Sequence, residues 1–191
     1  MLIPLETFLE MTSEETVKEV ISTFYCSKDN DIESFLKNEN KAILYERKSK
    51  SRTYLIFDED GLENGSFVLL AYFTIAIQTL KIPNGTAASQ IRKLDGLYAK
   101  KGSEALTEIP SYLIGQLGKN DKYTDKIAGD ELLEYALSVI SKAQGIVGGR
   151  VAFIECQDKP QLINFYTRNG FKYFRKDPDD GLVQMVRLLD K

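Results

Sequence analysis

Apolar residues recur along this chain at two different spacings, and the order of those spacings predicts an α/β fold. Residues 112–117 and 151–156 are short apolar runs typical of buried strands. Between them, apolar residues at helical spacing predict a helix over about 130–143, with Gly145 as its C-cap. The buried stripe of this helix consists of Leu133, Ala136, Leu137 and Ile140. A strand, a crossover helix and a second strand predict a parallel strand pair in a right-handed βαβ unit.

The N-terminal part has a helical pattern followed by a strand pattern. Thr12 and Glu15 form a capping-box pattern that predicts a helix over about 13–26. A second apolar stripe predicts a helix over about 31–46. The residues that follow predict a β-hairpin, with a strand over 53–57, a turn over 58–65 and a long strand over 67–81.

The remaining segments are an irregular excursion and a closing hairpin. Glycines interrupt residues 84–107, so we expect an irregular path there with one short helix over about 87–93. Pro160 suits the first turn of the last helix, and Gly170 suits its end. The closing strands are expected over about 171–175 and 182–189, joined by a turn at 177–181.

This order of elements predicts a single α/β domain over residues 1–191, with a mixed, twisted sheet of about six or seven strands and helices on both faces. No apolar run approaches the roughly 18 residues of a membrane span, so no membrane partner is expected. The N-terminus lacks the basic region of a signal peptide. Cys26 and Cys156 show no metal-ligand spacing and favour a reduced, cytoplasmic setting.

Two features of the composition exclude classes of chemistry. The chain has no histidine, which excludes a histidine-based triad, an imidazole base and a histidine-ligated metal, and we expect no metal. The formal net charge is −3, so the surface as a whole is not built to attract nucleic acid. Lys48, Lys50 and Arg52 form a local basic group, for which a solvated loop is the simpler interpretation.

Residues 111–171 carry the sharpest functional pattern. An apolar strand leads into a polar loop that ends at Gly129, a helix and a second strand follow, and a short helix then carries Tyr166 and ends near Gly170. This order resembles the acetyl-CoA half of the GNAT N-acetyltransferase superfamily. The resemblance is strong over this part of the chain and loose over the rest.

In the resembled family, a Q/R-x-x-G-x-G/A signature precedes the long helix, and its backbone N–H groups surround the diphosphate of coenzyme A. The aligned residues 124–129 keep the last glycine, Gly129, but have Thr124 at the first position and Ile127 in place of the middle glycine. The isoleucine side chain would have to point away from the phosphates. The alternative interpretation is an ordinary solvated loop in which Asp130 caps the helix. The resemblance implies cofactor-binding residues at Thr124, Asp125, Lys126, Ile127, Ala128, Gly129 and Asp130.

The resemblance also implies that the strand before this loop ends in a bulge, where the two parallel strands splay and the backbone pairs with the pantetheine arm. Gly115 and Gly118 are unusual inside an apolar strand and indicate a bulge, a close backbone approach or the end of the strand. Leu117, Gly118 and Lys119 are therefore further candidate cofactor-binding residues, with main-chain contacts expected at Leu117 and Lys119.

Tyr166 is the candidate catalytic residue. In the family, the tyrosine of this helix lies beside the thioester sulfur. Amine attack on the acetyl carbonyl forms a tetrahedral intermediate that expels the coenzyme A thiolate, and a phenol can protonate or hydrogen-bond that sulfur. Taken alone, Tyr166 is more typical of a half-buried aromatic that anchors a short helix.

No motif identifies the base that deprotonates the amine. Glu155 and Glu108 lie beside the expected strands, but a structural role is the simpler interpretation of each. Cys156 lacks a histidine that would generate its thiolate, so we interpret it as a strand-end cysteine rather than a nucleophile.

The resemblance implies transfer of an acetyl group from acetyl-CoA, the cosubstrate, to a primary amine of a small molecule or protein by direct attack. The acceptor site would be formed by the first two helices and residues 78–110. Residues 71–76 and 109–117 also look like the GNAT toxin branch that acetylates aminoacyl-tRNA, but the arginine- and glycine-rich phosphate loop of that branch is missing. We therefore do not expect a nucleic-acid partner. A non-catalytic module that binds coenzyme A or docks a partner is the third reading, and a homodimer is compatible with each of them.

Overall fold

The structure is a computed structural model that describes residues 1–97 and 106–189. Within these residues, seven strands form one mixed sheet in the order β1-β2-β3-β4-β5-β7-β6. The strands are β1 (Leu2–Pro4), β2 (Arg52–Phe57), β3 (Leu69–Lys81), β4 (Glu108–Lys119), β5 (Val151–Cys156), β6 (Lys172–Lys176) and β7 (Val183–Leu188). The helices are α1 (Leu5–Met11), α2 (Glu14–Ser22), α3 (Asn30–Lys37), α4 (Ala42–Arg47), α5 (Glu59–Glu63), α6 (Ala88–Asp95), the 3-10 helix η1 (Asp121–Tyr123), α7 (Gly129–Val147) and α8 (Pro160–Arg168).

The chain divides into two compact units. The N-terminal unit contains Met1–Ala76 and Gly115–Ser138, and the C-terminal unit contains Ile77–Ile114 and Val139–Lys191. Strands β3 and β4 and helix α7 contribute residues to both units. The α/β class, the mixed sheet and the flanking helices predicted from the sequence are confirmed, whereas the single domain over 1–191 stays a prediction.

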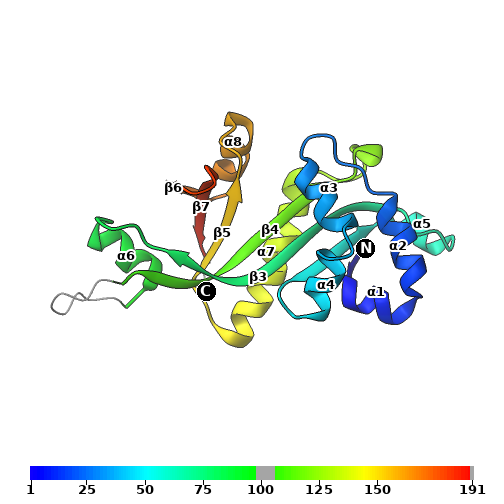
Figure 1. The fold of residues 1–191 in the computed structure, drawn as a ribbon, viewed down its shortest axis with the longest axis horizontal. Helices are drawn as coiled ribbons and strands as arrows, with labels where there is room; N and C mark the ends of the chain where they lie inside the picture. Colours follow the sequence, from blue (N-terminus) through cyan, green and yellow to red (C-terminus); the bar gives the residue numbers. More distant parts are fainter. Residues whose placement is uncertain (98–105, 190–191) are drawn as a thin grey trace. The chain divides into compact units, whose positions relative to one another are not determined.

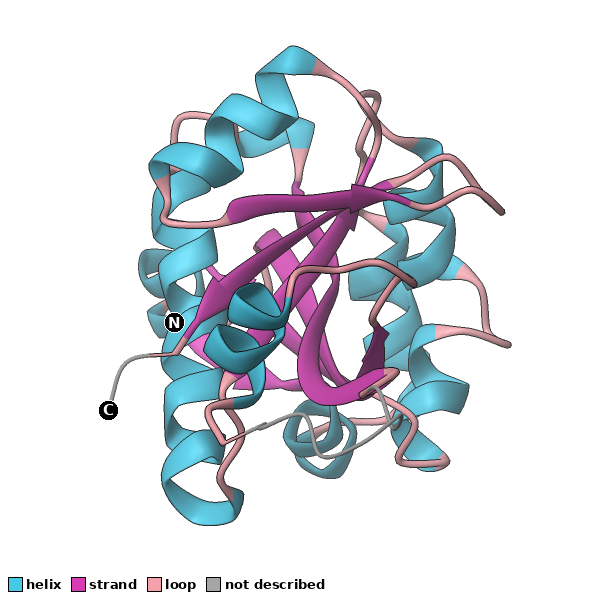
Figure 2. Ribbon diagram, turned by 90° about the vertical axis from the view of Figure 1, so that its left-hand side faces the viewer, coloured by secondary structure: helices cyan, strands magenta, loops and turns pink. Residues whose placement is uncertain are grey.

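In the N-terminal unit, helices lie on both faces of the strands. Helices α1 to α4 cover one face of β2 and β3, and the first part of α7 lies on the other (Figure 1). Figure 2 shows the same ribbon from another side, with helices in cyan and strands in magenta. The core beneath α1 to α4 consists of apolar side chains from every one of these helices and strands, among them Phe8, Val17, Ile21, Phe24, Leu36, Ile43, Leu55, Phe57, Leu69 and Tyr72. Burial of this apolar surface is the main force that holds the unit together.

In the C-terminal unit, β4 and β5 form the predicted parallel pair, with Tyr112 opposite Ala152 and Ile114 opposite Ile154. Strand β7 pairs antiparallel with both β5 and β6, which confirms the closing hairpin. The core of this unit consists of Leu80, Ile82, Ile91, Leu94, Ile109, Val151, Phe153 and Val186. Within the described ranges, no helix is both long and apolar enough to cross a membrane.

The first predicted helix begins and ends at different residues from those expected. Helix α2 is capped by Ser13, whose hydroxyl accepts a hydrogen bond from the N–H of Thr16 at 3.1 Å. Thr12, the predicted cap, instead donates its hydroxyl to the carbonyl of Phe8 in α1. The apolar pattern did not predict α1, because a helix of two turns is too short to establish a period.

The predicted helix over 31–46 is two helices, α3 and α4. Asn38 ends α3 in an extended conformation (φ −76°, ψ 120°). Its side chain accepts a hydrogen bond from the N–H of Asn40 at 2.9 Å. This local bond offers the backbone an alternative to the helical ladder, which explains the break.

Two further boundaries differ from the prediction. Residues 58–65, predicted as a turn, contain the short helix α5. Helix α7 runs through Gly145 and ends at Val147, and Gly148 follows in the left-handed conformation with φ 79°. Gly148 is therefore the glycine that ends the helix.

The segment before β4 is described in part. Helix α6 confirms the short helix predicted over 87–93, and Gly96 ends it with φ 89°. Residues 98–105 of the predicted excursion lie outside the described residues.

Candidate active site

Strand β4 ends in a segment that approaches the helices of the N-terminal unit closely. The pairing of β4 with β5 runs to Ile114, and β4 itself continues to Lys119. A Cβ atom placed on Gly118 would lie 2.3 Å from the Cγ2 atom of Ile32 in α3, so this position requires glycine. The sequence left open a bulge, a close backbone approach or a strand end at Gly118. The structure shows that Gly118 allows the backbone of β4 to approach α3 closely.

The loop after β4 starts from a buried asparagine that the sequence analysis did not identify. Asn120 is fully buried, and its side-chain amide donates to the carbonyl of Leu69 at 2.9 Å and to that of Thr23 at 3.4 Å. Its side-chain oxygen accepts from the N–H groups of Tyr25 at 3.3 Å and Lys122 at 3.2 Å. These bonds tie the start of the loop to the segment between α2 and α3. The signal in the sequence was a polar residue directly after an apolar strand.

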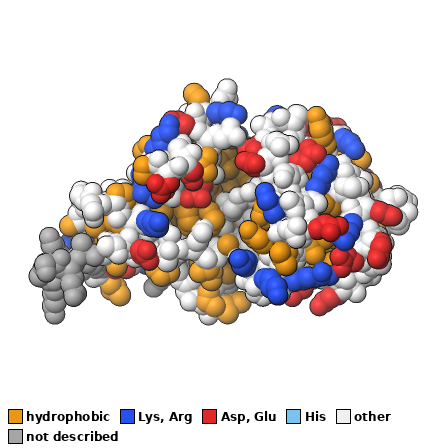
Figure 3. Space-filling view, in the orientation of Figure 1, with side chains coloured by type: hydrophobic (Ala, Val, Ile, Leu, Met, Phe, Trp, Pro, Cys, Tyr) orange, Lys and Arg blue, Asp and Glu red, His pale blue; other side chains and the backbone are white. Residues whose placement is uncertain are grey.

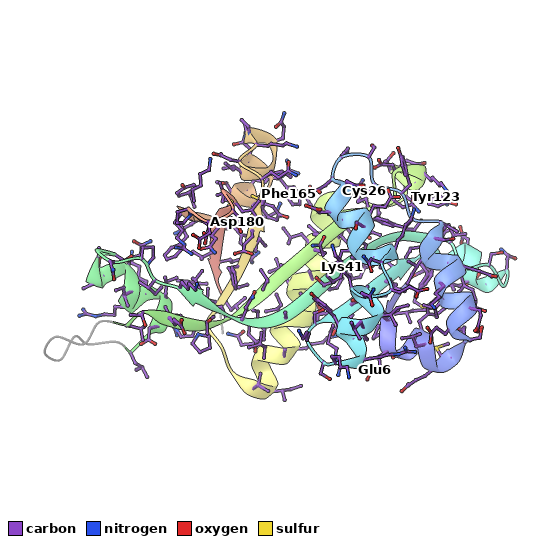
Figure 4. All side chains as sticks on the ribbon, in the orientation of Figure 1. Glu6, Cys26, Lys41, Tyr123, Phe165 and Asp180 are labelled. Atoms are coloured by element: carbon purple, nitrogen blue, oxygen red, sulfur yellow. The ribbon has the colours of Figure 1, made fainter. Side chains whose placement is uncertain are left out.

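Asp121 adds a second tie between these segments. Its carboxylate accepts hydrogen bonds from the hydroxyl and the N–H of Ser27, and its own N–H donates to the carbonyl of Tyr25 at 2.8 Å. The bond from the Ser27 hydroxyl lowers the pKa of Asp121. Figure 4 labels Cys26 and Tyr123, which lie on the two tied segments.

The loop itself is held by Lys119. The Lys119 Nζ donates to the carbonyl oxygens of Thr124, at 2.9 Å, and Ile127, at 2.6 Å. The side chain of Ile127 is 3 % exposed and points into the N-terminal unit, as expected if its position must leave space for phosphates. The Lys126 ammonium forms an ion pair with Asp58 at 3.5 Å.

The other predicted cofactor-binding residues lie on the surface of this loop. Thr124, Asp125, Ala128 and Asp130 are exposed, and Gly129 is half-buried. Helix α7 begins at Gly129, and its N-terminus lies at the end of this loop. The N–H groups at a helix N-terminus carry the positive end of the helix dipole and can bind an anion.

Tyr166 lies on α8 in the C-terminal unit and is 8 % exposed. Its ring packs edge-on against the rings of Phe165 and Phe171, with centroids 4.9 Å and 5.7 Å away. Figure 4 labels Phe165 on this helix. Burial raises the pKa of the Tyr166 hydroxyl well above its usual range, with a smaller contribution from Cys156. The hydroxyl therefore stays protonated at physiological pH and can act as a hydrogen-bond donor.

The surroundings of Glu155, Glu108 and Cys156 give none of these side chains a catalytic role. Glu155 is exposed and accepts a hydrogen bond from the Gln184 amide at 2.7 Å, and Glu108 is exposed. Cys156 is buried, and burial raises the pKa of its thiol to about 11. A thiol with this pKa is almost entirely protonated near neutral pH, which argues against a nucleophilic role.

The N-terminal unit also has a cavity of about 300 Å³ that contains none of the predicted site residues. Its lining residues are Glu6, Leu9, Glu10, Glu14, Glu46 and Arg47. Glu6 and Tyr123 lie at opposite ends of the N-terminal unit in Figure 4. Two of the acidic residues that line this cavity form ion pairs: Glu14 with Arg47, and Glu46 with Arg52 at 2.7 Å.

The surface over the helices of the N-terminal unit mixes both signs of charge on the face shown in Figure 3. Within residues 1–97 and 106–189, no group of three His, Cys, Asp or Glu side chains lies close enough to hold a metal ion.

Solved structures share this fold. A bacterial toxin superimposes with a TM-score of 0.68 over 98% of this chain and 90% of its own, at 18% identity. The toxin AtaT complexed with acetyl-methionyl-tRNA gives a TM-score of 0.64 over 86% of this chain and 85% of its own, at 18% identity. A tyrosine-to-phenylalanine mutant of AtaT, bound to the C-terminus of the antitoxin AtaR and to acetyl-CoA, gives 0.61 over 88% and 84%, at 16% identity.

Comparison of the sequence alone identifies no relatives: no family model matches the chain, and no curated protein matches it. At identities of 16% to 18%, the structural likeness establishes the fold. The chain has the GNAT fold, so the resemblance predicted from its sequence is confirmed for the fold.

Proposed function

We propose that this chain transfers an acetyl group from acetyl-CoA to a primary amine by direct attack. The observation that carries the proposal is the loop over 119–129, which the side chains of Lys119 and Asn120 hold in place and which leads into the N-terminus of α7. Such a loop suits a diphosphate, because it offers backbone donors and the positive end of a helix dipole. In the same fold, AtaT binds acetyl-CoA.

The cofactor would be held mainly by backbone groups. We place its diphosphate at the N–H groups of Asp125, Ala128 and the first turn of α7. The pantetheine arm would run along the backbone between Gly115 and Lys119, beyond the last residue of β4 that pairs with β5. The remaining predicted residues of the loop, Thr124, Lys126 and Asp130, would surround the phosphates from the solvent side.

The reaction needs one bond formed, one broken and two proton movements. The neutral amine nitrogen attacks the acetyl carbonyl carbon, and the carbon–sulfur bond then breaks to release the coenzyme A thiolate. Tyr166 donates a hydrogen bond to that sulfur, because burial raises the pKa of its hydroxyl and so favours a hydrogen bond over complete transfer of the proton. The proton of the attacking amine leaves to water or to an acidic side chain, for which Glu155 and Glu108 are the candidates.

A second candidate for the acceptor is the amine of an aminoacyl-tRNA. It is favoured by the complex of AtaT with acetyl-methionyl-tRNA, which has the same fold. The net charge of −3 favours a small molecule or a protein instead. We propose a cytoplasmic setting for either acceptor, where acetyl-CoA is available and the cysteines stay reduced.

Two measurements test the function. Calorimetry with acetyl-CoA tests binding, and release of the coenzyme A thiol tests turnover with small amines, peptides and aminoacyl-tRNA in parallel. Turnover with one acceptor class identifies the substrate. Binding without turnover across the panel supports a non-catalytic coenzyme A module, and absence of binding at millimolar acetyl-CoA contradicts the proposal.

A further inference from the structure

We propose that Lys119 is the positioning residue of the loop that binds the diphosphate, an inference that rests on the function proposed above. Its side chain would fix the direction of the peptide groups of the loop, so that their N–H groups face the phosphates before the cofactor arrives. The role is exerted through the backbone of the loop and does not require contact between the ammonium and a phosphate.

The contacts of Lys119 are specific. Lys119 is the last residue of β4, and its ammonium contacts the loop that follows the strand. Nζ donates to the carbonyl oxygens of Thr124 and Ile127, at 2.9 Å and 2.6 Å. These are the two positions at which the loop departs from the Q/R-x-x-G-x-G/A signature. The side chain thus bridges the first and fourth positions of the aligned segment.

A bond to each carbonyl also fixes the N–H group of the same peptide, because a trans peptide is planar and its C=O and N–H point in opposite directions. With the carbonyl of Thr124 held by Lys119, the N–H of Asp125 faces away from Lys119. The same geometry turns the N–H of Ala128 away. The positive charge beside each carbonyl oxygen polarises these peptides and strengthens their N–H groups as donors to an anion.

Ile127 explains why the loop needs this tie. Glycine lets a loop take conformations in which the backbone approaches a phosphate, and isoleucine does not. Among the described residues, Ser49 is the one non-glycine residue with positive φ, so Ile127 has an ordinary backbone conformation. Its buried side chain anchors one side of the loop, and Lys119 fixes the carbonyls. Together they would replace the order that the missing glycine motif provides.

A purely electrostatic role for Lys119 is the competing explanation. Lys122 provides the matched comparison, because it lies on the same loop, carries the same charge and is exposed. Within the described residues, no hydrogen bond from its ammonium to a carbonyl of the loop is found. Loss of either lysine changes the charge of the loop equally, but only loss of Lys119 frees the two carbonyls.

The binding test compares Lys119→Met with Lys122→Met. We expect Lys119→Met to raise the Kd for acetyl-CoA about tenfold or more, since two charge-assisted bonds are lost, and Lys122→Met to change it less than about threefold. The Kd for acetyl-pantetheine, which lacks the diphosphate, should change less than about twofold in both variants. In turnover, the KM for acetyl-CoA should rise in Lys119→Met while kcat at saturation is retained. Lys119→Arg keeps the donors and should retain most of the affinity.

The second test needs no ligand. The N–H of Lys126 donates to the carbonyl of Tyr123 at 3.1 Å inside the loop. In free Lys119→Met, hydrogen exchange of this amide should be at least about tenfold faster, because the loop opens more often, and in Lys122→Met it should stay near the wild-type rate. Equal losses of affinity in the two methionine variants, or unchanged exchange at Lys126 in Lys119→Met, would overturn the positioning role. Wild-type protein that binds no acetyl-CoA would instead contradict the proposed function.

Discussion

The hydroxyl of Tyr166 can be removed with little disturbance of its surroundings. The ring packs against Phe165 and Phe171, and these contacts survive in Tyr166→Phe. If the hydroxyl stabilises the departing thiolate, its interaction is strong in the transition state and weak in the ground state. We expect kcat to fall by roughly 10²–10⁴-fold, with the KM for acetyl-CoA and the melting temperature near wild type.

Steady-state and single-turnover kinetics check this prediction together. An unchanged single-turnover rate would show that Tyr166 does not donate to the sulfur. A large drop in melting temperature would support the structural interpretation of this buried aromatic instead.

At the residue scale, the sequence predicted properties that depend on one side chain and missed those that depend on two distant ones. Ile127 was expected to point away from the phosphates, and its side chain is buried, whereas the phosphate site itself stays a prediction. The bonds of Asn120 to Thr23 and Leu69 join segments far apart in the chain, so no local pattern contains them. The hydrogen bonds from Lys119 to the carbonyls of Thr124 and Ile127 depend on the path of the loop backbone, which residue types alone do not specify.

Gly118 allows a strand and a helix to approach each other, and this has a measurable consequence at the element scale. A Cβ atom there would meet the Cγ2 atom of Ile32 at 2.3 Å, and Ile32 is branched at Cβ and cannot rotate freely aside. We expect Gly118→Ala to lower the free energy of unfolding by about 1–3 kcal/mol. In chemical denaturation, Gly118→Ala combined with Ile32→Ala should lose less stability than the sum of the single changes, and strict additivity would contradict this contact.

Gly145 lies inside α7, and nothing there requires a glycine. A Cβ atom at this position would meet no atom within 4 Å, and its φ is not positive. We expect Gly145→Ala to stabilise the protein by about 0.5 kcal/mol, because alanine loses less backbone entropy in a helix. Denaturant titration checks the sign, and a destabilised variant would mean that the helix does not extend past residue 145.

Gly129 begins the same helix at the end that faces the loop. Gly129→Glu places a bulky carboxylate where the phosphates are proposed to bind, so acetyl-CoA affinity should fall by roughly tenfold or more. Gly145→Ala, in the same helix but away from its N-terminus, is the matched control and should bind acetyl-CoA as the wild type does. Wild-type affinity in Gly129→Glu, measured by calorimetry, would place the phosphates elsewhere.

Element prediction succeeded where a pattern was long and failed where it was short. The strands of the βαβ unit and the 19 residues of α7 have enough apolar positions to establish a period. The two-turn helix α1 and the five residues of α5 do not. The break between α3 and α4 depends on the bond from Asn40 to Asn38, which competes with a helix that the apolar stripe favours.

At the scale of the whole molecule, ligand binding should appear as stability. A ligand that binds the folded chain alone stabilises it by about 2.7 kcal/mol at a concentration of 100 times its Kd. For a chain of 191 residues, each kcal/mol raises the melting temperature by roughly 2–4 °C. Acetyl-CoA at that concentration should therefore raise the melting temperature by about 5–10 °C.

The variants above turn this shift into a test of where the ligand binds. Gly129→Glu should shift less than the wild type at the same acetyl-CoA concentration, because its Kd is weaker. Tyr166→Phe should shift fully, because a hydroxyl that acts in the transition state adds little to ground-state affinity. A scanning fluorimetry series over acetyl-CoA concentration measures all three. If the melting temperature of the wild type does not change at millimolar acetyl-CoA, cofactor binding is contradicted. If Gly129→Glu shows the full wild-type shift, the phosphates do not bind at the start of α7.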